Sequence, residues 1–138
     1  MKVVRIVNTA KNPKKASEGS AGYDLFACED KTIYPGERMK VPLGIAFRVP
    51  YGTYGRLASR SGIVSRTGVA VEAGTIDRDY TGPVSLLLHH RGKDPYEIKA
   101  GHSIAQLILE KITHARVVEV DELPVTDRGS GGWGSTGI

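Results

Sequence analysis

The sequence contains one cysteine, Cys28, and this scarcity excludes both an internal disulfide framework and a zinc site built on cysteine thiolates. It also lacks an apolar run long enough to cross a bilayer, and it lacks the apolar core of a signal peptide. We therefore expect a soluble intracellular protein, of the cytoplasm or nucleus, with no membrane partner. No glycine-rich run ends in Gly-Lys-Ser or Gly-Lys-Thr, which excludes an ATPase of the P-loop class.

A large excess of charge of one sign is absent as well. Nineteen lysines and arginines against 15 aspartates and glutamates give a net charge of +4. This surplus is too small to predict binding to nucleic acid, although it suits a small polyanionic ligand. The four histidines show no spacing typical of metal ligands, and we interpret them as surface or hydrogen-bonded residues.

What the sequence does contain is a series of short apolar or alternating segments separated by turn residues. At 138 residues the chain is long enough for one domain with a proper core. Short strands at close spacing predict an all-β sandwich or jelly roll, with one weak helical segment at 59–67. The predicted strands cover residues 2–7, 21–27, 32–34, 39–49 (interrupted at Pro42 and Gly44), 51–58, 69–76, 84–88, 96–98, 103–109 and 116–120.

A polar turn near the middle of the chain is the first candidate for function. Gly74 and Gly82 bracket this turn, which carries Asp77, Asp79 and Tyr80 between two predicted strands. Aspartate is common in turns, so two carboxylates exposed to water are the simpler interpretation of this turn taken alone. Other stretches of the chain favour a functional interpretation.

Two further stretches could hold a ligand. Arg60, Ser61 and Gly62 form a plausible phosphate cradle, because they offer a guanidinium fork, a hydroxyl and a close approach at the start of a helical turn. Such a triplet also occurs by chance. Gln106 stands among apolar residues, and a buried amide must find partners. It either ties two loops together or donates to a ligand oxygen.

The C-terminal segment 124–138 contains five glycines, two serines and one aromatic residue, Trp133. Little in it could form a core, so we expect it to be mobile when free. Arg128 and Trp133 within it suggest a lid that orders over a ligand, with a disordered terminus as the alternative. Taken together, these carboxylates, basic groups and the buried amide suit a phosphorylated substrate bound with a hard cation.

Five stretches, in order, resemble the five motifs of the trimeric deoxyuridine triphosphatase (dUTPase) family. They are residues 21–25 (Ala-Gly-Tyr-Asp-Leu), 60–62 (Arg-Ser-Gly), 74–82 (Gly-Thr-Ile-Asp-Arg-Asp-Tyr-Thr-Gly), 101–106 and 128–137. Single motifs are weak, but five in order at plausible spacing are specific. The resemblance implies a distorted jelly-roll or β-clip-like domain at 1–123 and a flexible lid at 124–138, in a homotrimer whose subunits share active sites. The implied reaction is hydrolysis of dUTP to dUMP and pyrophosphate with Mg²⁺, which limits uracil incorporation into DNA and supplies dUMP for thymidylate synthesis.

The resemblance also implies a role for each motif residue. Asp77 would be the catalytic residue that orients and activates the attacking water, and Tyr80 would pack under the deoxyribose. Asp24 would reach the metal through water. The other substrate-binding residues would be Gly74 and Ile76 at the uracil, Arg60, Ser61, Gly62 and Gln106 at the phosphates, and Arg128, Trp133, Gly134, Ser135 and Thr136 in the lid.

The sequence departs from the family pattern in three places and leaves two alternatives open. Ser59 replaces a proline and should loosen its turn slightly, Trp133 replaces a phenylalanine, and His102-Ser103 replace a charged pair with a local effect only. One alternative is a dCTP deaminase or bifunctional relative on the same fold, for which Glu72 is the nearby acid before the hairpin. The other is a nucleotide-gated regulatory binding protein.

Overall fold

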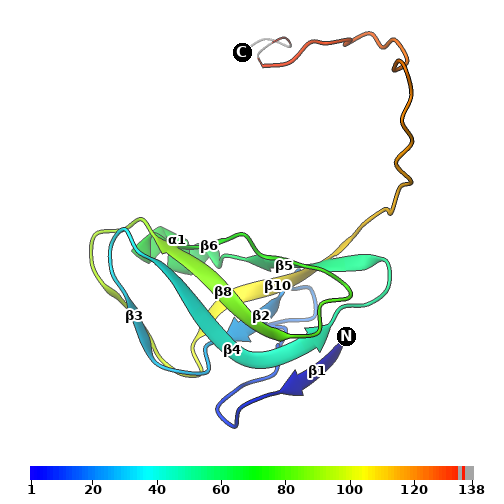
Figure 1. Cartoon of the computed structure of the whole chain (residues 1–138). Coiled ribbons are helices and arrows are strands. Elements are labelled where there is room, and N and C mark those ends of the chain that lie inside the picture. Colours follow the sequence, from blue (N-terminus) through cyan, green and yellow to red (C-terminus); the bar gives the residue numbers. More distant parts are fainter. Residues whose placement is uncertain (134, 136–138) are drawn as a thin grey trace.

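The computed structural model describes residues 1–133 and 135, and within them the chain forms three antiparallel sheets and one short helix (Figure 1). The elements are β1 (Lys2–Arg5), β2 (Tyr23–Phe26), β3 (Lys31–Ile33), β4 (Arg38–Arg48), β5 (Thr53–Ala58), α1 (Ser61–Thr67), β6 (Val69–Glu72), β7 (Thr75–Ile76), β8 (Pro83–His90), β9 (Tyr96–Ile98) and β10 (Ser103–Lys111). One four-stranded sheet has the order β1-β4-β8-β6 and the other the order β2-β10-β5-β7, while β3 pairs with β9. The predicted all-β class is confirmed.

Alternating burial along the two longest paired strands builds the core. In β4 every second residue from Val41 to Phe47 is buried, and in β8 every second residue from Val84 to His90 is buried. Successive side chains of a strand point to opposite faces, so this pattern buries one face of the first sheet. Leu25 and Leu107 of the second sheet belong to the same buried cluster. The core therefore lies between the two four-stranded sheets.

Two histidines of β8 have hydrogen-bond partners, as the interpretation of the histidines predicted. His89 lies with its Nδ1 2.8 Å from a carboxylate oxygen of Glu72. The buried ring of His90 accepts the N–H of Gly92 at Nδ1 over 3.0 Å. Its proton is therefore on Nε2, which donates to the carbonyl oxygen of Asp94 over 2.7 Å.

The strand predicted for residues 69–76 is divided between the two sheets. β6 pairs with β8 in the first sheet, whereas β7 pairs with β5 in the second. Between β6 and β7 lie Ala73 and Gly74, with φ angles of 56° and 101°. These values lie in the left-handed region, where the backbone changes direction sharply. The segment that carries Asp77 consequently leaves from the second sheet.

The helix and the interruption in β4 agree with the sequence patterns. α1 ends at Gly68, which has a left-handed conformation and donates its N–H to the carbonyl oxygen of Val64. The pairing of β4 with β8 shifts register between Pro42 and Ala46, around Gly44 with a φ of 64°. In the described part of the chain, no helix has the length and apolar character needed to cross a membrane.

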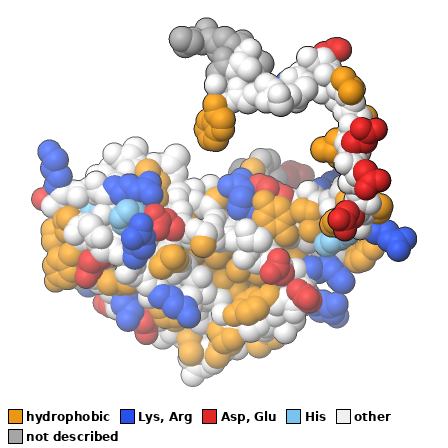
Figure 2. All heavy atoms as spheres, turned by 45° about the horizontal axis from the view of Figure 1, so that its top comes forward, with side chains coloured by type: hydrophobic (Ala, Val, Ile, Leu, Met, Phe, Trp, Pro, Cys, Tyr) orange, Lys and Arg blue, Asp and Glu red, His pale blue; other side chains and the backbone are white. Residues whose placement is uncertain are grey.

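Residues beyond β10 leave the domain as an extended arm (Figure 1). The strand predicted for 116–120 is wrong for the single chain, because no strand pairs with these residues and Val117 is 96% exposed. The valines at 117, 118 and 120 favour a strand, but an isolated strand leaves its backbone groups without partners. Figure 2 shows the arm standing clear of the body of the domain, with hydrophobic side chains along it.

Candidate active site

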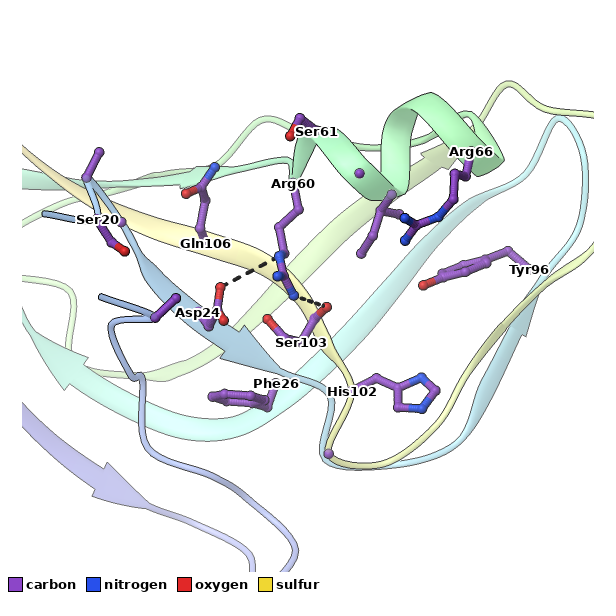
Figure 3. Close-up of a pocket in the computed structure, with 16 residues that line it drawn as sticks. Ser20, Asp24, Phe26, Arg60, Ser61, Arg66, Tyr96, His102, Ser103 and Gln106 are labelled. Carbon is purple, nitrogen blue, oxygen red and sulfur yellow. Dashed lines mark hydrogen bonds and ion pairs between the residues drawn. The ribbon is translucent and has the colours of Figure 1, made fainter. Parts of the chain in front are cut away.

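Two cavities collect most of the residues that the sequence motifs singled out. The larger has a volume of about 740 Å³ and contains Asp24, Arg60, Ser61, Gly62 and Gln106 in its lining (Figure 3). The smaller has a volume of about 260 Å³ and is lined by Lys40, Thr75, Ile76, Asp77, Tyr80, Pro83, Val84 and Ser85. Among the described residues, none lines both cavities. A single copy of the chain therefore keeps the hairpin residues and the phosphate-cradle residues apart.

The central position of β10 explains how three distant motifs reach the larger cavity. β10 pairs with β2 on one side, where Gln106 is opposite Asp24. It pairs with β5 on the other side, where Gln106 is opposite Ala58. Arg60 lies two residues after the end of β5 and directly before the start of α1. The strand order thus brings residues that are far apart in the sequence onto one surface.

The Arg60 side chain is held on two sides. Its Nη1 donates to the carbonyl oxygen of Ser103 over 2.8 Å, and its Nε lies 3.6 Å from a carboxylate oxygen of Asp24 (Figure 3). A guanidinium fixed in this way presents its remaining N–H groups in a defined direction. Arg60 is therefore pre-oriented at the edge of the cavity that Asp24 also lines.

Gln106 contacts both the loop before α1 and the glycine of the first motif. Its Nε2 donates to the carbonyl oxygen of Ser59 over 3.0 Å. A Cβ atom on Gly22 would lie 2.7 Å from the Oε1 of Gln106, so the amide occupies the space that the glycine leaves. Gln106 thus ties two loops together while it also lines the cavity.

The Ser59 side chain ties its loop to a neighbouring strand. Its hydroxyl accepts the backbone N–H of Val71 over 2.8 Å. This bond connects the loop before α1 to β6, and a proline, which has no hydroxyl, could not form it. The slightly loosened turn stays a prediction.

The hairpin tip places Asp77 and Tyr80 in the smaller cavity. The N–H of Tyr80 donates to the carbonyl oxygen of Asp77 over 3.2 Å and closes the turn. Asp77 is exposed. The next residue, Arg78, has its guanidinium carbon 5.2 Å from the centre of the Tyr51 ring, a cation–π contact that anchors the tip to the loop after β4.

Gly74 lines neither of these two cavities. A glycine stands at this position for a steric reason. Its carbonyl oxygen accepts the N–H of Leu57 over 2.7 Å. An added Cβ would lie 2.6 Å from the carbonyl oxygen of Leu57. Glycine is required there because β7 packs closely against β5.

The described lid residues lie on the arm. Arg128 donates from Nε to the carbonyl oxygen of Gly131, three residues further on, over 2.8 Å. Trp133 is fully exposed. Ser135 donates its backbone N–H to the carbonyl oxygen of Gly132 over 2.7 Å. Gly134 and Thr136 lie outside the described residues.

The donors of the larger cavity fit a magnesium ion that is shared with a phosphorylated ligand. In residues 1–133 and 135, no group of three or more histidine, cysteine, aspartate or glutamate side chains could hold a metal alone. Asp24 is the carboxylate in the cavity lining. Mg²⁺ keeps several waters and commonly takes one or two carboxylates together with phosphate oxygens. One carboxylate beside a phosphate cradle matches that requirement.

Six residues outside the five motifs also line the larger cavity. They are Ala16, Ser20, Phe26, Ile63, Arg66 and Tyr96. Arg66 could have been found from helical spacing, since it stands four residues after Gly62 on the predicted helix. Tyr96 carried no such signal, because its position depends on the pairing of β9 with β3.

Comparisons with known proteins place this geometry in a family. A family profile described as dUTPase matches residues 8–137. The deoxyuridine 5'-triphosphate nucleotidohydrolase of Paramecium bursaria Chlorella virus 1 is 48% identical over 136 residues, which are 99% of this chain and 96% of the relative. The protein of the same name from Mus musculus is 46% identical over 137 residues, which are 99% of this chain and 85% of the relative.

A solved structure agrees with these sequence matches. The Staphylococcus bacteriophage 80alpha dUTPase, solved with dUPNHPP, superposes with a TM-score of 0.91 at 28% identity, over 99% of this chain and 98% of that chain. The fold and the relatives thus define a class, the all-β nucleotidohydrolases. The chain belongs to the dUTPase family.

Proposed function

We propose that this chain is a dUTP diphosphatase, which hydrolyses dUTP to dUMP and pyrophosphate with Mg²⁺ as a homotrimer with shared active sites. The reaction follows from the family, because relatives at 42–48% identity are deoxyuridine 5'-triphosphate nucleotidohydrolases. In a cell this reaction would limit uracil incorporation into DNA and supply dUMP for thymidylate synthesis.

One observation carries the proposal of shared sites. The hairpin that holds Asp77 and Tyr80 and the cavity that holds Arg60 and Gln106 are separate in a single copy, and both are open to solvent. Hydrolysis needs the attacking water and the phosphates in one place. In each subunit the domain 1–123 would form both the hairpin and the cavity. A neighbouring copy can then bring its cavity to the hairpin.

In this arrangement the hairpin selects the nucleoside. Tyr80 packs under the deoxyribose, and the ring leaves no space for a 2′-hydroxyl. Backbone groups near Gly74 and Ile76 bond the edge of the uracil. A site whose polar groups match uracil rejects cytosine, because the wrong base leaves buried donors or acceptors unpaired. Asp77 orients the water and accepts its proton as the water oxygen bonds to the α-phosphorus, while the bond from that phosphorus to the bridging oxygen breaks and pyrophosphate leaves.

The larger cavity holds the triphosphate. Arg60, Ser61, Gly62 and Gln106 donate to the phosphate oxygens, and Arg60 is already oriented by its bond to Ser103. Asp24 would hold Mg²⁺ through its water shell, and the bound ion would neutralise phosphate charge. Asp24 also lies against Arg60, so both ends of the ion pair face the same ligand.

The lid 124–138 completes the site from a further subunit. Arg128 would approach the terminal phosphate and Trp133 would stack on the uracil. Gly134, Ser135 and Thr136 would close over the phosphates. The exposure of Arg128 and Trp133 in the single chain supports this role, since the hydrogen bond of Arg128 in the described residues goes to Gly131 of the same arm. Closure excludes bulk water and adds positive charge near the reacting group.

The deaminase alternative has less support. It needs a carboxylate free to act on the base, and Glu72 is instead engaged by Arg38, His89 and Arg91 at 2.7 to 2.9 Å. Ammonia release from dCTP would reverse this ranking.

The direct test is pyrophosphate release from dUTP, beside dCTP, dTTP and UTP, in the presence of Mg²⁺. We expect rapid release from dUTP alone. Asp77→Asn should lower turnover by ~10²-fold or more while nucleotide binding persists. Asp79→Asn is the matched control, since it removes the same charge two residues along the same turn and should cost much less. Equal activity of wild type and Asp77→Asn would contradict the role of Asp77.

Shared sites have a separate test by subunit mixing. Asp77→Asn and Arg60→Ala each damage one half of every site if the halves come from different subunits. After mild dissociation and reassembly of a mixture of the two variants, some sites combine two intact halves, and activity should recover. A mixture that stays as inactive as its components would show that each site lies within one chain. Light scattering gives the mass of the assembly.

A further inference from the structure

The smaller cavity contains a lysine that has no role in the proposed function. Lys40 and Asp77 are the two charged residues of its lining. Asp77 comes from the hairpin tip, whereas Lys40 belongs to β4, which lies between β1 and β8 in the first sheet. A strand outside the hairpin therefore contributes a cation to the cavity that would hold the nucleoside.

Lys40 stands on the outer face of the first sheet. The next residue, Val41, is buried in the core, while Lys40 itself is exposed. On β8, Ser85 stands between the buried residues Val84 and Leu86, so it also belongs to the outer face. Lys40 and Ser85 thus project from the same side of the sheet, and both line the cavity.

The pairing of β4 with β8 fixes the order of these residues along the cavity (Figure 1). β8 begins at Pro83, three residues after Tyr80 of the hairpin tip. Ser85 follows two residues later, and Lys40 is paired with Leu87, a further two residues along the strand. Lys40 therefore comes from the end of the cavity that is remote from the hairpin tip.

The chemistry of the base decides what a cation at this end would select. With the deoxyribose over Tyr80, the base extends away from the tip toward Ser85 and Lys40. A lysine ammonium has three donors and no acceptor, and no ion pair of Lys40 occurs in residues 1–133 and 135. Uracil presents two carbonyl oxygens, O2 and O4, which accept hydrogen bonds. Cytosine has an amino group in place of O4, and this group donates.

We propose that Lys40 is a specificity-determining residue whose ammonium donates a hydrogen bond to the O4 oxygen of uracil. The inference rests on the proposed function, because it takes the position of the base from the deoxyribose at Tyr80. A charged donor makes a stronger bond to a carbonyl oxygen than a neutral donor does. Facing the amino group of cytosine, the same ammonium would be left without an acceptor. Lys40 thus adds to the selection for uracil by the hairpin backbone.

Calorimetry with the full chain compares dUMP with dCMP, which share the sugar and the phosphate. We expect Lys40→Met, which keeps the length of the side chain and removes its charge, to weaken dUMP binding by about tenfold. Binding of dCMP should stay unchanged, so the preference for uracil falls by the same factor. Lys40→Arg keeps a cationic donor and should retain most of this preference.

Lys93→Met is the matched control. Lys93 is an exposed lysine of the loop after β8 that lines neither of the two cavities, so this variant should bind both nucleotides as wild type does. Lys40 is exposed too, and a thermal melt of Lys40→Met should match wild type. An unchanged preference for dUMP in the folded Lys40→Met protein would overturn the proposal.

Sulfur substitution in the base identifies the oxygen that Lys40 contacts, because sulfur is a weak acceptor. The wild-type protein should bind 4-thio-dUMP more weakly than dUMP, and Lys40→Met should cost almost nothing further with this ligand. With 2-thio-dUMP, Lys40→Met should keep its full effect of about tenfold. The reverse pattern would move the contact to O2, which cytosine shares, and would overturn the role of Lys40 in rejecting cytosine.

Turnover of dUTP separates this inference from the proposed function. Lys40→Met should raise the KM with kcat nearly unchanged, because a contact to the base is made equally in the substrate complex and in the transition state. A lower kcat at constant KM would place the action of Lys40 on Asp77 and overturn the contact to the base. A wild-type protein that prefers dUMP through Lys40 but does not hydrolyse dUTP would retain this inference and refute the proposed function. An active protein whose preference does not depend on Lys40 would refute the role of Lys40 alone.

Discussion

The hydroxyl of Tyr80 donates a hydrogen bond to the carbonyl oxygen of Pro83 over 2.8 Å, and its ring lies against Gly82 between them. A Cβ atom on Gly82 would lie 2.8 Å from the hydroxyl oxygen and 2.9 Å from the ring carbon that carries it. The glycine therefore fixes where the aromatic ring can lie in the smaller cavity.

Gly82→Ala should displace the Tyr80 ring and raise the KM for dUTP by about tenfold, because overpacking of this kind typically costs about 1–3 kcal/mol. Discrimination against UTP should fall as well, since the displaced ring no longer fills the space of the 2′-hydroxyl. Tyr80→Phe keeps the ring and loses only the bond to Pro83, so its KM should change less. Steady-state kinetics with both nucleotides measure these effects. A Gly82→Ala enzyme with unaltered kinetics would mean that the ring position does not matter.

Gly22→Ala should move the Gln106 amide, because the new Cβ would lie 2.7 Å from its Oε1. The shift breaks the bond from Gln106 to Ser59 and removes a donor from the larger cavity. We expect a loss of stability of about 1–3 kcal/mol and a lower kcat/KM. Denaturant unfolding and kinetics test this. Gly19→Ala is the matched control, because nothing lies within 4 Å of its Cβ position, and it should leave both properties as in wild type.

Glu72 stabilises the first sheet through charge. Hydrogen bonds from Arg38 and His89 lower the pKa of Glu72 from 4.5 to about 2. Because the pKa is lower in the folded state, the resulting stability is fully present above pH 4.5 and is lost as pH falls toward 2. Glu72→Gln should therefore destabilise the protein clearly at pH 7 and much less at pH 2.5.

Thermal melts of wild type and Glu72→Gln at both values of pH measure this difference. Glu18→Gln, which removes an exposed charge from the loop after β1, is the control and should melt as wild type does at pH 7. A Glu72→Gln penalty that is equal at both values of pH would show that the carboxylate acts by packing and not by charge.

Trp133 offers a direct signal of lid closure, because it is the single tryptophan of the chain. Its side chain is fully exposed in the single chain. Stacking on a uracil should change its fluorescence when a non-hydrolysable dUTP analogue binds, and the signal should saturate with the analogue. Trp133→Phe keeps a flat ring, so it should retain most activity while this signal disappears. An unchanged emission from a protein that demonstrably binds the analogue would refute the lid.

Much of the fold and family could be predicted from the sequence, since the patterns concerned are local. Alternating burial in β4 and β8 and the glycine at the end of α1 are properties of short segments. The five motifs are local as well, and the relatives confirm the family and reaction that they indicated. The predicted strand at 116–120 shows the limit of this reasoning. Its valines are typical of a strand, but a local pattern does not supply the neighbouring strand that pairing requires.

The sequence by itself determined the all-β class, the family and the identity of the candidate site residues. Only the tertiary structure decided which of them meet: β10 places Gln106 between Asp24 and Ala58, and the turn at Ala73–Gly74 carries Asp77 to a different cavity. It also decided that the Ser103 hydroxyl is buried without a partner in the described residues and lies in the same cavity as Arg66. The physical reason is range: alternation and turn preferences act within a few residues, whereas a cavity depends on strand pairing between segments that are distant in the chain.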